Sequence, residues 1–238
     1  MKNEALASWI RGMSENNLSN DDMVRTLGYA RDLERGLATI RSYPQGVSIF
    51  GSARVGEDDK YYKKARELGK LLANNGHAVV TGGGPGIMEA GNRGAFEYGG
   101  RSIGLNIQLA HEQEPNPYLT DMLEFKYFFA RKVMLAMSAK VYVYFPGGFG
   151  TMDEFSEILI LMQEGKMPKM PMFLIGKSFW APLDKFFAKK MAPAGLIKRT
   201  DMNIYKMTDD VMDVVRAANK IGHPIIRENI YDGYSESI

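Results

Sequence analysis

The chain has 238 residues, of which 45% are hydrophobic, and 30 Lys and Arg residues against 28 Asp and Glu residues leave a net charge of +2. This balance disfavours a nucleic-acid partner, and the lack of cysteine excludes disulfides, thiolate metal sites and cysteine nucleophiles. No apolar run is long enough to span a membrane and no signal-peptide core is present, so we expect a cytoplasmic protein with a small-molecule partner.

Residues 1–45 are expected to form a helical extension. Ser19, Asn20 and Asp21 supply capping residues, and apolar residues then recur every three or four positions, at Met23, Val24, Leu27, Ala30, Leu33, Leu37 and Ile40. A helix with such an apolar face packs either on the main sheet or on a second subunit, and the sequence leaves both partners open.

From Val47 onward, short apolar runs alternate with glycine or polar turns and with helical patterns. Strands are expected at 47–50, 78–81, 102–106, 122–125, 141–145 and 170–175, and helices at 61–75, 87–98, 129–138, from 151 to about 165, at 179–191 and at 208–221. This βαβ alternation predicts an α/β fold, a Rossmann-like doubly wound parallel sheet with helices on both faces. We therefore expect one main domain at 46–222, followed by an irregular tail at 223–238.

Two glycine-rich segments, Gly82–Gly86 and Pro146–Gly150, directly follow predicted strands. Such loops expose backbone N–H groups, and the following helix adds its partial positive charge, so the natural ligand is a phosphate group. Neither segment fits GxGxxG, and no acidic residue follows at the distance that reads a ribose, which disfavours an NAD site. The plainer interpretation is that each segment only makes a tight turn.

Thr151 and Glu154 open the helix after the second glycine segment, and two interpretations stay open. With Thr151 as N-cap, Glu154 takes the third helical position and the pair forms a capping box. Alternatively, the Thr151 hydroxyl binds a phosphate and Glu154 faces the ligand. Arg131 and Lys132 stand in the first turn of another predicted helix, where the helix dipole disfavours basic residues. They indicate an anionic ligand unless they are simply solvated.

Other residues carry weaker signals. The polar stretch 108–120, which contains Glu112, is long for a connection in an α/β domain, and such connections are more often functional than idle. Phe128 and Phe129 are expected in the core, with stacking on a base as the alternative. The three histidines are too scattered for a metal triad, and no metal or other cofactor is expected.

Three motifs, in this order, resemble signatures of the Lonely Guy (LOG) family: Gly82-Gly83-Gly84-Pro85-Gly86-Ile87-Met88, then Arg131-Lys132, then Pro146-Gly147-Gly148-Phe149-Gly150-Thr151-Met152-Asp153-Glu154. The resemblance covers about residues 47–175. Members are cytokinin riboside 5′-monophosphate phosphoribohydrolases, many bacterial relatives also cleave AMP, and the family was long labelled as lysine decarboxylases. The resemblance implies hydrolysis of the N-glycosidic bond of a nucleoside 5′-monophosphate, without a metal, to free base and ribose 5-phosphate.

The same resemblance assigns roles to residues. Glu154 is expected to stabilise positive charge on the sugar and to orient or activate water, and Arg131 to orient the substrate. Substrate contacts are expected from Gly83, Gly84, Glu112, Lys132, Gly147, Gly148, Gly150 and Thr151. Family members assemble as dimers or larger oligomers, so we expect at least a homodimer, with the extension at 1–45 as an additional contact.

Departures from the family pattern keep some questions open. Phe128-Phe129-Ala130 replaces the Met-His-x of plant members, which leaves the preferred base open. No histidine precedes a lysine, so a Ser-x-His-Lys pyridoxal site is missing and a decarboxylase has no chemical support. A different class, the molybdenum cofactor carriers and nucleotide sensors, shares the fold and the glycine loops but binds without turnover. A third interpretation is an interaction protein that binds no nucleotide at all.

Overall fold

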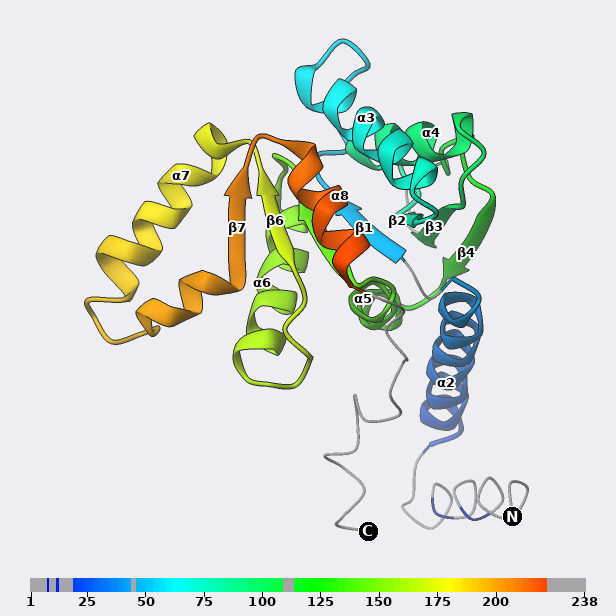
Figure 1. Cartoon of the computed structure of the whole chain (residues 1–238). Coiled ribbons are helices and arrows are strands. Elements are labelled where there is room, and N and C mark those ends of the chain that lie inside the picture. Colours follow the sequence, from blue (N-terminus) through cyan, green and yellow to red (C-terminus); the bar gives the residue numbers. More distant parts are fainter. Residues whose placement is uncertain (1–7, 9–11, 13–18, 44–45, 109–113, 222–238) are drawn as a thin grey trace.

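The computed structural model describes residues 8, 12, 19–43, 46–108 and 114–221, and Figure 1 shows their arrangement. The strands are β1 Gly46–Phe50, β2 Ala78–Thr81, β3 Ser102–Ile107, β4 Asp121–Phe125, β5 Val141–Tyr144, β6 Met172–Ile175 and β7 Tyr205–Thr208. The helices are α2 Asn20–Arg41, α3 Lys60–Asn74, α4 Ile87–Glu97, α5 Phe128–Met137, α6 Phe149–Gln163, α7 Lys177–Phe186, η1 Phe187–Met191, η2 Arg199–Ile204 and α8 Val211–Lys220.

The seven strands form one sheet in the order β4-β3-β2-β1-β5-β6-β7, and every neighbouring pair is parallel. The predicted doubly wound α/β fold is therefore confirmed. From β1 the chain first builds outward to β4, and after α5 it returns to the other side of β1 to start β5. The strand order thus reverses beside β1, and ligands of open α/β sheets bind outside the carboxyl ends of the strands at such a reversal.

Helices cover both faces of the sheet, and each face has its own apolar core. Helices α3, α4 and α8 lie over one face, while α2, α5, α6 and α7 pack on the other, as Figure 1 shows. Side chains alternate along β5 in the manner of a strand buried on both sides: Val141 and Val143 join the first core, and Tyr142 and Tyr144 join the second.

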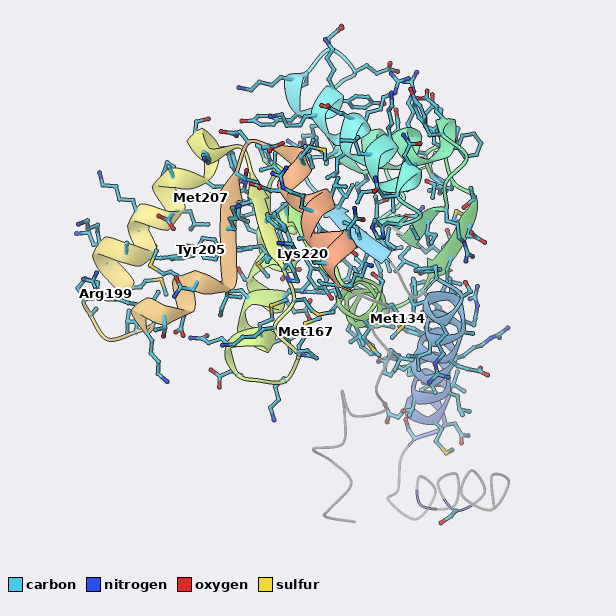
Figure 2. The ribbon with its side chains drawn as sticks, viewed as in Figure 1. Met134, Met167, Arg199, Tyr205, Met207 and Lys220 are labelled. Carbon is cyan, nitrogen blue, oxygen red and sulfur yellow. The ribbon has the colours of Figure 1, made fainter. Side chains whose placement is uncertain are left out.

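The packing partner of α2 is α5 of the same chain. The buried Asp32 carboxylate accepts hydrogen bonds from the backbone N–H groups of Lys126 (2.8 Å) and Tyr127 (3.0 Å), just before α5 begins. One turn further along α2, Gly36 lies directly against Met134, which Figure 2 labels on α5 beside α2. The amino-terminal part of the predicted apolar face does not share this packing, because Val24 and Leu27 are exposed; they are 69% and 46% accessible.

The carboxyl-terminal region differs from the sequence prediction. Residues 205–208 form the edge strand β7, whose Tyr205 and Met207 are labelled in Figure 2, so the expectation that Thr208 begins a helix was wrong. Helix α8 begins only at Val211, because the Asp210 carboxylate caps it by accepting from Met212 N–H at 2.9 Å. A four-residue edge strand with an exposed lysine at its second position has too weak an apolar pattern to be seen without its partner β6. The predicted tail at 223–238 lies outside the described residues.

Candidate active site

The loop after β5 leads directly into α6, whose N-cap is Gly148. No side chain caps this helix, so its first-turn N–H groups lack the side-chain acceptor that usually satisfies one of them. Thr151 is the third helical residue rather than the N-cap, and the capping-box interpretation of Thr151 and Glu154 was therefore wrong. The glycine at 147 is required, because a Cβ there would lie 2.1 Å from the Thr151 hydroxyl oxygen. An uncapped helix start beside exposed glycines is suited to binding an anion.

Glu154 lies one turn further along α6 and is buried, with 5% of its surface exposed. Its Oε2 atom has no hydrogen-bond partner among the described residues. Burial raises the pKa of this carboxyl to about 7, against the lowering effect of the nearby Arg131 guanidinium. The Tyr144 hydroxyl fixes the local backbone by donating to the Glu154 carbonyl oxygen at 3.2 Å. The site therefore holds a carboxylate that exchanges a proton near neutral pH.

Arg131 donates to a backbone carbonyl of β3 and packs against the first residue after β2. Its Nε donates to the Leu105 carbonyl oxygen of β3 at 2.9 Å. Its Nη2 lies so close to Gly82, the first residue after β2, that a Cβ at that position would be 2.2 Å away. Burial lowers the pKa of Arg131 and the Glu154 carboxylate raises it, and a guanidinium remains charged in either case. The structure thus places the Arg131 guanidinium near the Glu154 carboxylate.

Lys132, the next residue of α5, faces two carboxylates of α6. Its Nζ lies 2.8 Å from an oxygen of Asp153 and 3.3 Å from an oxygen of Glu157. Its side chain is 16% exposed, so it is not simply solvated. The Lys132 amino group, which was expected to contact the substrate, thus forms ion pairs with the acid that precedes Glu154 in the sequence and with one that follows it.

Two asparagines that no sequence motif marks fix the loop after β2. Asn116 donates its backbone N–H to the Gly83 carbonyl at 2.8 Å and its side-chain amide to the Gly84 carbonyl at 3.0 Å. The same amide donates to the Asn92 side chain at 3.0 Å. Asn116 belongs to the long polar stretch 108–120, which was the available signal, whereas nothing in the pattern of α4 marked Asn92. Glu112 lies outside the described residues.

The aromatic residues at the starts of α5 and α6 are not core residues. Phe128, Phe129 and Phe149 are 52%, 45% and 95% exposed, so the expectation of core packing for the first two was wrong. Both stand at the amino-terminal end of α5, where the preceding strand β4 ends at the same edge of the parallel sheet as β2 and β5. The Phe129 ring packs edge-on against Tyr29, with ring centroids 4.8 Å apart, whereas the Phe128 and Phe149 rings are available to a ligand or to another protein surface.

A surface hollow of about 560 Å³ lies away from the candidate site. It is lined by charged side chains of α3 and its preceding loop, including Glu57, Lys63 and Arg66, together with Glu97 of α4. None of the site residues lines it.

Within 19–43, 46–108 and 114–221 no group of three or more His, Asp or Glu side chains is arranged to hold a metal ion. No helix of these ranges is long and apolar enough to cross a bilayer.

Comparison with known proteins agrees with the motifs. A cytokinin riboside 5′-monophosphate phosphoribohydrolase of Rhodococcoides fascians is 28% identical over 149 residues, which is 61% of this chain and 75% of the relative. A pyrimidine/purine nucleotide 5′-monophosphate nucleosidase of Escherichia coli K12 is 27% identical over 232 residues. That alignment covers 91% of this chain but 49% of the relative, so the chain spans about half the length of that nucleosidase.

Among solved structures, the molybdenum cofactor carrier protein of Chlamydomonas reinhardtii aligns with a TM-score of 0.54 and 27% identity, over 74% of this chain and 96% of that one. The family model described as "Possible lysine decarboxylase" matches residues 88–218, which is more than half of the chain and includes Arg131, Glu154 and the second glycine loop. The chain therefore belongs to this family, the one that also contains the LOG phosphoribohydrolases its motifs resemble.

Proposed function

We propose that this protein hydrolyses the N-glycosidic bond of a nucleoside 5′-monophosphate and releases the free base and ribose 5-phosphate. The observation that carries the proposal is the buried Glu154 carboxylate, which has an unpartnered oxygen and lies near Arg131, one turn after an uncapped helix start. The names of the R. fascians and E. coli relatives support the same reaction class.

The 5′-phosphate is assigned to the start of α6. Backbone N–H groups of Gly147, Gly148 and Gly150 and the Thr151 hydroxyl supply the donors, and the helix dipole adds a favourable potential for a dianion. The loop after β2, with Gly83 and Gly84, forms the facing wall. Its rigidity comes from Asn116, which holds both of these glycine carbonyls.

Glu154 and Arg131 carry the chemical step. The bond between the base nitrogen and C1′ breaks with its electron pair on the base, and positive charge develops on the ribose ring. The Glu154 carboxylate stabilises that charge and takes a proton from the water whose oxygen bonds to C1′. The departing base takes up a proton from solvent, and Glu154 returns its own proton to solvent, so that one water is consumed for each bond broken. Arg131, held by Leu105 and packed on Gly82, orients the anionic substrate. The reaction therefore requires Glu154 in its ionised form.

A carrier or sensor is the second candidate, because the C. reinhardtii carrier shares the fold over 74% of this chain. Such a protein binds its ligand without turnover, and it has no need for a buried carboxyl whose pKa is about 7 beside an arginine. This pair favours the hydrolase over the carrier.

The test is a base-release assay with AMP and with isopentenyladenosine monophosphate. We expect Glu154→Gln and Arg131→Ala each to lower kcat/KM at least about 100-fold, since each removes a group that acts in the transition state. Glu164→Gln, which removes an exposed carboxylate from the C-cap of the same helix, serves as the matched control and is expected to retain wild-type activity. The ratio of kcat/KM for the two substrates then decides between adenine and a cytokinin as the preferred base.

Release that collapses in both variants and persists in the control supports the proposal. If the wild type binds nucleoside monophosphates, as measured by calorimetry, but releases base from none of the purine or pyrimidine forms, the hydrolase is wrong and the carrier stands. A sample that binds none of them favours an interaction protein instead.

A further inference from the structure

We propose that Lys132 is a positioning residue that neutralises Asp153 and Glu157, so that Glu154 remains a carboxylate, and that it does not contact the substrate. The inference rests on the proposed function, because it takes the ionised Glu154 as the group that the reaction needs. It differs from the role that the sequence resemblance gave to Lys132, which was a substrate contact.

The geometry begins with three acidic residues within little more than one turn of α6. Asp153 directly precedes Glu154, and Glu157 follows it at the i+3 position, where helical side chains are neighbours. Lys132 reaches across from α5 with its Nζ at 2.8 Å from Asp153 and 3.3 Å from Glu157. One lysine therefore bridges the two acids that accompany the buried carboxyl.

The charges around Glu154 come from two helices. From α5, Arg131 and Lys132 lower its pKa; from α6 itself, Glu157 and Asp153 raise it. The strand β5 contributes the Tyr144 hydroxyl, which donates to the Glu154 backbone carbonyl. Without Lys132, two negative charges near the site would have no cation bridging them. Because like charges disfavour ionisation of a neighbouring acid, Glu154 would then hold its proton to a higher pH.

A lysine ammonium has three N–H donors, and two of those of Lys132 face carboxylates. A phosphate that drew this ammonium away from the two acids would expose Asp153 and Glu157 to each other and to Glu154 at the moment when the dianionic substrate arrives. Such a site would gather negative charge where the reaction already needs Glu154 ionised. The uncapped start of α6 offers the phosphate a partner without this cost.

The experiment compares the pH dependence of kcat/KM for AMP in the wild type, Lys132→Met, Lys132→Arg, Glu157→Gln and the double variant Lys132→Met/Glu157→Gln. We expect the acidic limb of Lys132→Met to move up by about one pH unit, a loss of about tenfold at pH 6 that nearly disappears at about pH 9. The double variant is expected to move the limb back toward the wild-type midpoint, and arginine at 132 to keep the wild-type profile. Lys166→Met, at an exposed lysine after α6, is the matched control.

A loss in Lys132→Met that is equal at all pH values, appears as a raised KM and is not reversed by Glu157→Gln would overturn the proposal in favour of a substrate contact. If Lys132→Met does not fold, the single variants Glu157→Gln and Asp153→Asn decide, because each is expected to move the acidic limb down. An unchanged limb in both contradicts the inference.

A direct titration separates this inference from the proposed reaction. In protein labelled with ¹³C at the glutamate carboxyl carbon, the resonance that is lost in Glu154→Gln belongs to Glu154. Its midpoint is expected to rise in Lys132→Met and to return toward the wild-type value in the double variant. If the wild type releases no base, the proposed function fails while this titration still decides the role of Lys132.

Discussion

The burial of Glu154 has a cost in stability as well as a use in catalysis. Its pKa is about 7 in the folded chain, against a reference value of 4.5. Between these two values the folded protein binds a proton that the unfolded chain has lost, so stability falls as pH rises through this window and the cost is complete above pH 7.

Replacing the carboxyl should remove that cost. We expect Glu154→Gln to raise the free energy of unfolding at about pH 8 by on the order of 2 to 3 kcal/mol, and to change it little at about pH 4, where the acid is neutral in both states. Urea denaturation at the two pH values measures the difference, with Glu164→Gln as the exposed control. A variant that is less stable than the wild type at the higher pH would contradict the burial argument.

At the same scale, the sequence motifs named Glu154 as a candidate site residue but left its use undecided. Thr-x-x-Glu after glycines is compatible with a capping box and with a ligand site. The backbone of Gly148 decides against the capping box. Gly148 is extended and is the N-cap of α6, so Thr151 is already the third helical residue. Only the observed helix start places Glu154 beyond the capping position, where it is buried near Arg131.

At the scale of the elements, the loop after β2 depends on the segment that precedes β4. Asn116 is buried and its side-chain amide connects Gly84 to Asn92. Removing one partner leaves buried polar groups unsatisfied, which costs roughly 1 to 3 kcal/mol.

We therefore expect Asn116→Ala to lower the free energy of unfolding by about 1 to 3 kcal/mol and to raise KM for AMP more than it lowers kcat, because the loop is displaced while Arg131 and Glu154 remain. Thermal unfolding and steady-state kinetics on the same sample measure both effects. Asn74→Ala, at an exposed position of α3, is the control. Wild-type stability and KM in Asn116→Ala would show that the loop holds its shape without this link.

The strands whose apolar runs are continuous were predicted with nearly their observed bounds, as β2 at 78–81 shows. Buried parallel strands have this property because both of their faces contact helices. The edge strand β7 was missed, since it is exposed at Lys206 and its pairing with β6 is not visible locally.

At the scale of the whole molecule, the face that carries α2, α5 and α6 exposes large apolar side chains, among them Val24, Phe128 and Ile160. We expect at least a homodimer that covers part of this face, as measured by light scattering. Phe128→Glu should weaken the dimer, whereas Phe96→Glu on α4, over the opposite face of the sheet, should not. Specific interfaces usually have dissociation constants below about 100 μM. A wild-type protein that remains monomeric at about 100 μM would therefore refute the expectation.

Apolar periodicity and glycine spacing are local properties of the chain, so the amino-acid sequence was enough to predict the parallel α/β fold and the two glycine loops and to name Arg131 and Glu154 as candidates. The tertiary structure decided which residues face one another: Lys132 with Asp153 and Glu157, Asn116 with the loop after β2, and α2 with α5. These contacts join segments from different elements, and the order of the strands sets their distances. No local pattern encodes such distances, so only the folded sheet brings the pieces of the site together.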